Sequence, residues 1–225
     1  MRKGAAFTLA EVIITLGIVG VIAALSIPGL ITNMQKRQAE TKLKRFYAEI
    51  NQAVKLSAME TGIDVDGWVI RNKEYKQNDL DEFVNTYIRP CLNISYTKYI
   101  AKNPNACGGK CDRILIELNN GIAFSMYIDG NGGDVFLHPD PNKTNYKDPR
   151  ESFAFQMAKK TEMNGGEFVS VDSVEPYTMN WTDGKLSTLK NDNKRGCNRK
   201  SSSNNQYCTK LIQLNDWKIP ADYPW

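Results

Sequence analysis

Histidine is almost absent from this chain of 225 residues, which contains only His138. One imidazole excludes a multi-histidine metal site. It stands between Leu137 and Pro139, with no serine or cysteine in a nucleophile motif nearby, so we expect a structural histidine. The chain also lacks a phosphate-binding P-loop, a GxGxxG turn after a strand and a GxSxG motif. We therefore predict no enzyme activity and no catalytic residues.

The chain also has little excess charge. Its 29 Lys and Arg against 25 Asp and Glu leave a net charge of +4, which does not indicate a nucleic-acid partner. With 41% hydrophobic and 24% charged residues, the composition excludes a disordered chain, a collagen-like repeat and a multi-span membrane protein. At roughly 150 residues per domain, the length suggests one globular domain plus an extra element.

Charged residues are missing altogether from Val12 to Met34. The apolar stretch begins at Phe7 and is interrupted only by Glu11. About 20 apolar residues cross a bilayer as a helix, so this segment predicts a membrane span. A carboxylate inside such a span costs about 2.5–3.5 kcal/mol on insertion scales, which makes Glu11 a candidate functional residue.

Two ordinary interpretations compete for this segment. A secretory signal peptide would explain the basic start and could use Ala24-Leu25-Ser26 as its cleavage site. However, the run is longer than the roughly 7–15 residues of a signal core, and it contains Glu11. A plain uncleaved anchor also leaves Glu11 unexplained.

The basic leader, the small residues, then Phe7-Thr-Leu-Ala-Glu11 and an apolar helix resemble the class III signal of type IV prepilins and pseudopilins. The resemblance implies cleavage between Ala6 and Phe7 by a prepilin peptidase that also methylates the new N-terminus at Phe7. It places Glu11 at the family's assembly glutamate and Pro28 at its helix-interrupting proline. Glycine usually precedes the cut, and Gly4 offers an alternative site.

The resemblance implies a structural subunit of a type IV pilus or a type II secretion pseudopilus, polymerised through its apolar helix. The implied partners are other subunits, prepilin peptidase, an inner-membrane assembly platform and, before assembly, membrane lipid. The protein would span the bacterial inner membrane once, with its outer domain in the periplasm, before it enters a surface or periplasmic filament. The alternative is an anchored extracytoplasmic binding protein or enzyme that does not polymerise.

The predicted organisation is a leader at residues 1–6, a transmembrane assembly segment at 7–34 and a head domain at 35–225. One helix is expected from Phe7 to Thr61, stopped by Gly62 and kinked or loosened at Pro28. Its second half has apolar residues at helical spacing: Leu43, Phe46, Tyr47, Ile50, Val54 and Ala58.

The rest of the chain predicts a small antiparallel sheet. The pattern predicts a short helix over 79–88, a hairpin of strands 113–118 and 122–128, and strands at 134–137 and 168–171. Asn120-Gly121 is expected to supply the positive φ angles of the hairpin turn. Residues 191–206 are expected to form an exposed basic loop before a short element at 208–214. The fold class is therefore α+β: a long N-terminal helix packed on a small antiparallel sheet.

Five cysteines lie outside the apolar segment, at Cys91, Cys107, Cys111, Cys197 and Cys208. Outside the cytoplasm they should oxidise, whereas the spacings lack the CxxC pairs of common zinc sites. Cys197 and Cys208 bracket the polar loop and resemble the C-terminal disulfide loop of pilins. Closing a loop of this size with a disulfide stabilises the folded state by about 3 kcal/mol in the chain-entropy model. The pairing of the other three cysteines stays open.

The run from Asp129 to Asp134 places oxygen ligands at alternating positions, with Asn131 between them, in a glycine-rich turn. This pattern hints at calcium, which the pseudopilin branch of the family binds in a loop. The run lacks the closing glutamate and regular spacing of the twelve-residue calcium loop. We favour a simple turn that uses Asp, Asn and Gly for their backbone preferences, and we expect no cofactor.

Overall fold

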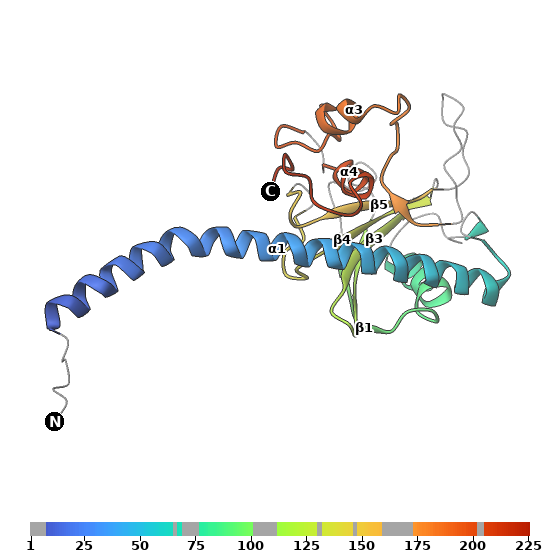
Figure 1. Cartoon of the computed structure of the whole chain (residues 1–225). Helices are drawn as coiled ribbons and strands as arrows, with labels where there is room; N and C mark the ends of the chain where they lie inside the picture. Colours follow the sequence, from blue (N-terminus) through green and yellow to red (C-terminus); the bar gives the residue numbers. More distant parts are fainter. Residues whose placement is uncertain are drawn as a thin grey trace. The chain divides into compact units, whose positions relative to one another are not determined.

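A computed structural model describes residues 8–64, 67–68, 77–100, 112–129, 132–145, 148–158, 173–201 and 205–225. The chain divides into two compact units between Ala39 and Glu40, close to the predicted boundary at residues 34 and 35. The second unit, Glu40–Trp225, is the head. The helix α1 begins in the first unit and ends in the head (Figure 1).

Helix α1 extends over Leu9–Thr61. Gly62 ends it in a left-handed conformation (φ +68°), and the Gly62 N–H donates to the Ala58 carbonyl at 2.9 Å. The predicted end of the helix is therefore confirmed, since glycine adopts this conformation without a Cβ penalty. The helix continues through Pro28 without interruption, although proline lacks the N–H of a helical hydrogen bond.

Within the head, α1 packs one face on the sheet. The ring of Phe46 lies 5.3 Å from the ring of Phe124 and 5.1 Å from that of Phe155, measured between centroids. Tyr47 and Ala58 are half-buried. The buried residues are Leu43, Phe46, Ile50, Ala53, Val54 and Ser57. Their spacing of three and four residues is that of one helix face, as predicted.

The short helix predicted over 79–88 is two elements. The α-helix α2 covers Gln77–Phe83, and a π-helical turn, η2, covers Val84–Ile88. Its widened turn is closed by a hydrogen bond from the Arg89 N–H to the Val84 carbonyl at 2.7 Å. The indole ring of Trp68 packs edge-on against Phe83 of α2 and stacks on Tyr87 of η2.

The sheet has six strands in the order β1-β2-β3-β4-β5-β6, each antiparallel to its neighbour. The strands are β1 Ile94–Ile100, β2 Arg113–Leu118, β3 Ala123–Asp129, β4 Gly132–His138, β5 Phe153–Ala158 and β6 Glu175–Pro176. The predicted hairpin and third strand are confirmed, whereas β1, β5 and β6 were not predicted. The strand predicted at 168–171 lies outside the described residues.

The two faces of the sheet differ in chemistry. Cross-strand register places Ile114, Ile116, Phe124, Met126, Val135, Leu137, Phe153 and Phe155 on the face that meets α1. The opposite face mixes apolar and polar groups. Its apolar residues are Leu115, Phe136 and Ala154, and its polar residues are Arg113, Ser125, Tyr127, Asp134, His138 and Gln156, all of them buried. The architecture is the predicted α+β fold, a long N-terminal helix whose second half packs on an antiparallel sheet (Figure 1).

The C-terminal region adds α3 (Leu186–Asn191) and α4 (Cys208–Leu214). The prediction that residues 191–206 form an exposed loop is wrong at two places, because Cys197 is 6% exposed and Asn205 is 5% exposed. The disulfide and the start of α4 hold these two parts of the loop in the head. Lys194, Arg199 and Lys200 are exposed, as predicted for a basic loop.

Candidate functional site

The first part of α1 is a helical surface made of large apolar side chains. Leu9 is 77% exposed and Leu25 is 79% exposed, and the same character extends to Met34 at 56%. Among the described residues, α1 is the one helix long and apolar enough to cross a membrane. A hydrophobic surface of this length requires a cover of lipid or of other protein.

Glu11 takes part in a reciprocal cap at the start of this helix. Its Oε2 accepts hydrogen bonds from the Thr8 backbone N–H at 2.8 Å and from Thr8 Oγ1 at 2.9 Å. The Glu11 N–H donates to Thr8 Oγ1 at 3.3 Å. This is a capping box, which satisfies two backbone donors that the first helical turn leaves unpaired. This cap was not predicted from the sequence, although the Thr-x-x-Glu spacing is its signature.

The cap uses only one carboxylate oxygen of Glu11. Within the described part of the chain, Oε1 accepts no hydrogen bond. An ionised carboxylate can accept several hydrogen bonds, so Oε1 remains available to a further donor. Ala6 and Phe7, the predicted cleavage and methylation residues, lie outside the described residues.

Pro28 lies within α1 itself. Thr32 Oγ1 donates to the Pro28 carbonyl at 2.9 Å, and Ser26 Oγ donates to the Ile22 carbonyl at 2.8 Å. Hydroxyl groups on both sides of the proline are thus hydrogen-bonded to the helix backbone. These bonds reduce the free-energy cost of placing a hydroxyl group in an apolar environment. The proline and its neighbours are compatible with a continuous membrane helix.

The predicted disulfide between Cys197 and Cys208 is present. It joins the loop after α3 to the first residue of α4, and the Cys197 N–H donates to the Leu189 carbonyl at 2.8 Å. The loop is further tied by Tyr207, whose hydroxyl donates to the Met179 carbonyl at 2.8 Å. Besides the disulfide, these two hydrogen bonds hold the loop to the rest of the head.

The remaining cysteines are Cys91, Cys107 and Cys111. Cys91 is a free, half-buried thiol whose Sγ lies 4.0 Å from Glu60, and burial followed by the charge of Glu60 raises its pKa. It is therefore a poor thiolate at neutral pH. Cys107 and Cys111, the other disulfide candidates, lie outside the described residues.

The calcium hypothesis gains no support from the one predicted ligand whose surroundings are described. Asp134 is buried and accepts a hydrogen bond from the Tyr127 hydroxyl at 2.5 Å. Asn131 and the side chain of Asp129 lie outside the described residues, so the site stays a prediction. Among the described residues, no three His, Cys, Asp or Glu side chains are grouped to hold a metal ion.

His138 belongs to a buried network on the polar face of the sheet. Its Nδ1 lies 3.1 Å from the Glu151 carbonyl, so Nδ1 carries the proton, and Nε2 accepts from Ser125 Oγ at 2.9 Å. Arg113 Nη1 donates to the same Oγ at 3.2 Å, and its guanidinium lies 4.1 Å from the ring centroid of Phe136. Burial lowers the pKa of His138 to about 4. Because Ser125 and His138 are fully buried, this pair is closed to a substrate from solvent.

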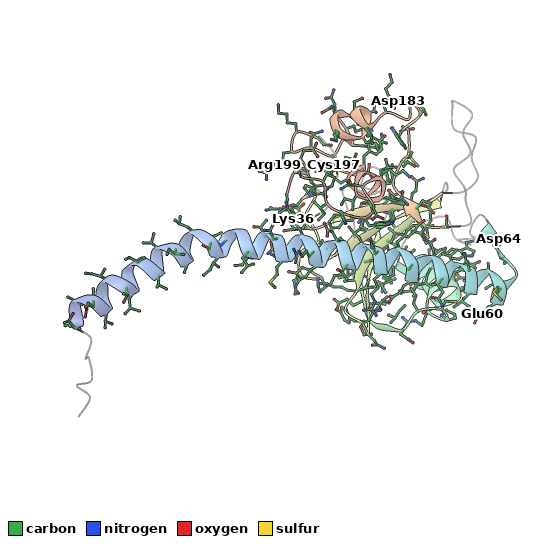
Figure 2. All side chains as sticks on the ribbon, viewed as in Figure 1. Lys36, Glu60, Asp64, Asp183, Cys197 and Arg199 are labelled. Atoms are coloured by element: carbon green, nitrogen blue, oxygen red, sulfur yellow. A yellow bond between two sulfur atoms is a disulfide. The ribbon has the colours of Figure 1, made fainter. Side chains whose placement is uncertain are left out.

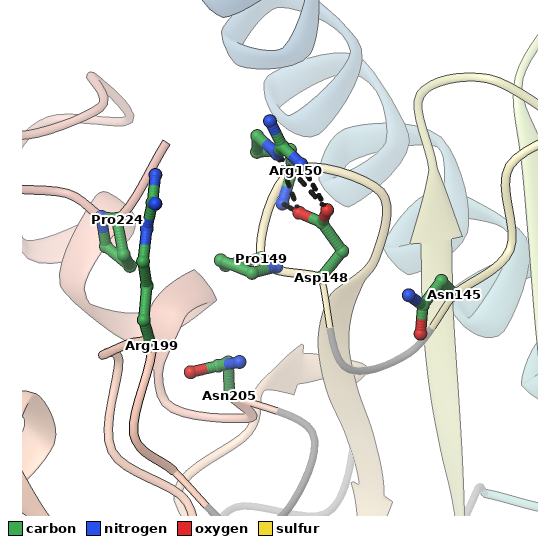
Figure 3. A pocket seen from close by; sticks show the side chains of 7 residues that line it. All are labelled: Asn145, Asp148, Pro149, Arg150, Arg199, Asn205 and Pro224. Atoms are coloured by element: carbon green, nitrogen blue, oxygen red, sulfur yellow. Dashed lines mark hydrogen bonds and ion pairs between the residues drawn. The ribbon is translucent and has the colours of Figure 1, made fainter.

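One surface cavity of about 280 Å³ lies beside the C-terminal loop (Figure 3). In its wall, Arg150 binds Asp148 through two side-chain nitrogens, Nη2 at 2.6 Å and Nε at 2.9 Å. It is lined by Asn145, Asp148, Pro149, Arg150, Arg199, Asn205 and Pro224. The cavity is smaller than the roughly 300–1,000 Å³ of typical small-molecule sites. The charges of Asp148 and Arg150 already neutralise each other.

Comparison with known proteins places the chain in a family. Residues 29–225 match the family of unknown function DUF6613, and the chain belongs to that family. A search of curated proteins finds no match. A search of solved structures also finds none. The family match covers the head and the end of the apolar segment, and begins after Glu11.

Proposed function

We propose that this chain is the precursor of a type IV pilin-like filament subunit, processed at the inner membrane and polymerised through the first half of α1. The observation that carries the proposal is an exposed apolar helix surface whose one charged group, Glu11, lies at its start. A simple anchor has no use for a carboxylate within the hydrocarbon region, where the charge makes insertion less favourable. A filament subunit has a use for it.

That use follows from the predicted cleavage. Phe7 would gain a free α-amino group, which is largely protonated at neutral pH. Glu11 would lie about one helical turn further along. In a filament, the amine of one subunit can meet the carboxylate of a staggered neighbour, and each charge then lowers the desolvation cost of the other. The unused Oε1 of Glu11 supports this arrangement, because the cap and an external amine can be bonded together.

The pairing would make Glu11 a register device. A subunit that is unassembled or misaligned would leave an uncompensated charge in an apolar environment, and only the correct stagger would remove it. The partners of such a subunit are other filament subunits, prepilin peptidase, the assembly platform and, before assembly, membrane lipid. The Cys197–Cys208 bond supports the pilus form of the filament over the type II secretion pseudopilus.

Two measurements on the full chain, expressed together with a prepilin peptidase, test the proposal. Intact-mass and N-terminal peptide analysis should find a chain that starts at a methylated Phe7 and lacks Arg2 and Lys3. Sheared or detergent-treated cells should yield the protein as a sedimentable polymer that electron microscopy shows as filaments. A retained leader with detergent-soluble monomers would instead identify an anchored protein, and cleavage after Ser26 a secreted one.

A further inference from the structure

The hairpin tip, residues 119–122, joins β2 to β3 and is bonded to α1. The Asn120 side-chain amide donates to both carboxylate oxygens of Glu49, to Oε2 at 2.8 Å and to Oε1 at 3.0 Å. Lys42 Nζ donates to the Gly121 carbonyl at 3.3 Å. Figure 2 shows the second half of α1, which ends just beyond Glu60, with side chains that reach into the head. Two charged residues of α1 therefore hold the tip on the helix.

The tip contains a pair of residues with its own chemistry, Asn120 followed by Gly121. Asparagine is a thermolabile residue, and a following glycine has no side chain to shield its backbone nitrogen. Both residues are exposed. Among the described residues, nothing lies within 4 Å of the position that a Cβ would take at Gly121. Solvent therefore reaches the two atoms that react in deamidation, Asn120 Cγ and the Gly121 nitrogen.

Deamidation at this pair needs only water. The Gly121 nitrogen loses its proton and forms a bond to Asn120 Cγ, the bond from Cγ to Nδ2 breaks, and ammonia leaves. Water then opens the resulting succinimide ring at one of its two carbonyl groups. The product is aspartate or isoaspartate at position 120, and the balance is one water consumed for one ammonia released.

Hydrogen bonds in the folded head oppose this reaction. The Asn120 side chain is held by Glu49 at Nδ2, and its Oδ1 accepts from the Ile122 N–H at 3.1 Å. The Gly121 N–H donates to the Leu118 carbonyl at 3.0 Å. Ring closure must rotate Asn120 Cγ onto the Gly121 nitrogen, which breaks these bonds. The bond to Glu49 is the strongest of them, because its acceptor is charged.

Glu49 is itself held in place on α1. Arg45 Nε donates to Glu49 Oε1 at 2.7 Å, and the Glu49 side chain is 27% exposed. The neighbouring positions Phe46 and Ile50 are buried, so this part of the helix cannot turn away from the sheet. The carboxylate is therefore kept in position to bind the Asn120 amide.

Reaction at Asn120 would reverse the contact with Glu49. An aspartate at position 120 has no amide hydrogens to donate, and its charge would face the Glu49 carboxylate at contact distance. Isoaspartate would also add one carbon atom to the backbone of a tight turn. Either product would detach the hairpin tip from α1, and the change is irreversible without repair.

We propose that Asn120 is a deamidation site and that Glu49 holds it unreactive while the hairpin tip lies on α1. The modification is a one-way record of how long the tip has been away from the helix. The inference concerns the head alone and does not depend on the proposed filament function.

Timed incubation of the detergent-solubilised full chain at mildly alkaline pH tests the site. Peptide mass spectrometry with fragmentation measures conversion of Asn120 in the folded chain and in the same chain unfolded in urea. Asn120 should convert readily in urea and at least about tenfold more slowly when folded, the factor given by one hydrogen bond to a charged group. Asn119, which precedes an asparagine instead of a glycine, should stay unconverted in both samples.

Variants at Glu49 test the protection. Glu49→Ala should convert about tenfold faster than wild type in the folded state. Glu49→Gln keeps a neutral acceptor and should react at an intermediate rate, because a neutral bond is weaker. Gln52→Ala, at an exposed position of the same helix, should keep the wild-type rate. Tryptophan fluorescence confirms that each variant is folded before its rate is compared.

Asn120→Asp reproduces one product and tests the release of the tip. Its Leu118 amide, which donates to the Ile122 carbonyl at 2.8 Å, should exchange hydrogen faster than in wild type, whereas β4 and β5 should exchange as before. Unchanged exchange at Leu118 would overturn the release.

The remaining outcomes decide the other two parts of the proposal. No conversion of Asn120 in urea overturns the site. Equal rates for folded wild type and Glu49→Ala overturn the protection, and slower conversion of Glu49→Ala overturns it too, because the carboxylate would then promote the reaction. None of these results bears on leader cleavage or sedimentation, so the filament proposal stands or falls separately.

Discussion

Phe46 of α1 packs edge-on against Phe155 of β5, with 5.1 Å between ring centroids and 66° between ring planes. Both side chains are almost completely buried. The contact joins residues from the first and the middle third of the head, and it lies where the helix meets the sheet. We therefore regard it as the centre of the core that holds α1 on the sheet.

Replacing Phe46 with alanine should lower the free energy of unfolding of the head by about 3–5 kcal/mol, because the cavity cannot collapse between two rigid elements. All four tryptophans lie in the head, so denaturant titration followed by tryptophan fluorescence reports its unfolding. Gln52→Ala, at an exposed position of the same helix, should change the free energy by less than about 0.5 kcal/mol. Equal effects of the two variants would contradict the assignment.

The same contact shows how far the sequence could predict the fold. Helical periodicity correctly identified Leu43, Phe46, Ile50 and Val54 as buried positions of α1, because one helix face repeats every three or four residues. It missed the small residues Ala53 and Ser57, which are buried on the same face. Strand β5 was missed, since Phe153 and Phe155 alternate with the small Ala154 and the polar Gln156, which the sequence gives no reason to bury. Only the register of β5 against β4 shows that both of its faces are covered.

The hairpin turn and the site show the same limit. Gly121 has φ +79°, as predicted, but Asn120 is not in the positive-φ region. Its side chain instead donates to Glu49 on α1 at 2.8 Å and accepts from the Ile122 N–H at 3.1 Å. The network around His138 was also beyond prediction, because its members come from separate strands and meet only through register.

That network predicts a pH dependence. The pKa of His138 is lowered to about 4 in the folded head, from about 6.5 in an unfolded chain, chiefly by burial. Protonation therefore favours unfolding. Stability should be unaffected above pH 6.5 and should fall by about 3 kcal/mol as the pH decreases to 4. Urea titrations at pH 7.5, 5.5 and 4.5 measure this loss.

His138→Gln provides the control for this pH dependence. Glutamine cannot titrate, so the variant should have a flatter profile between pH 6.5 and 4.5, even if its stability at neutral pH is lower. Carboxylates such as Asp148, whose pKa is lowered by its bonds to Arg150, lose their contribution mainly at lower pH. An identical pH profile in both proteins would show that His138 is not the titrating group.

The disulfide predicts an order of unfolding. Reduction of Cys197–Cys208 should cost about 3 kcal/mol in the chain-entropy model, and this loss should fall on the C-terminal loop because the sheet has its own apolar core. Trypsin should then cleave at Lys194, Arg199 or Lys200 before it cleaves β2 to β5. Mass spectrometry of timed digests, with and without reductant, detects that order.

Cys91 supplies the comparison, because it is a free thiol in the structure. Cys91→Ser should leave the digestion pattern unchanged, whereas Cys208→Ser should reproduce the effect of reductant in the absence of reductant. Cleavage of the strands together with the loop would mean that the head unfolds as one unit and that the loop has no separate stability.

Glu11 caps the helix, and we propose that its charge also directs assembly; Glu11→Ala cannot separate these two roles. Glu11→Ala removes the cap with Thr8 and the negative charge together. Loss of a cap alone costs about 1 kcal/mol of helix stability, which a long membrane helix can tolerate. Loss of the charge would remove the partner of the Phe7 amine. The variant that separates them is Glu11→Gln, since glutamine can also complete a capping box.

If the charge directs assembly, Glu11→Gln should insert and be processed normally but yield few or no filaments, because a neutral amide cannot compensate an ammonium group in an apolar environment. Thr8→Ala, which removes the capping hydroxyl and keeps the carboxylate, should retain most of the wild-type filament yield. Sedimentation after shearing measures the yield, and intact mass confirms leader cleavage in each variant. If Glu11→Gln polymerises as well as wild type while Thr8→Ala does not, the carboxylate serves only as a cap, and the register role is excluded.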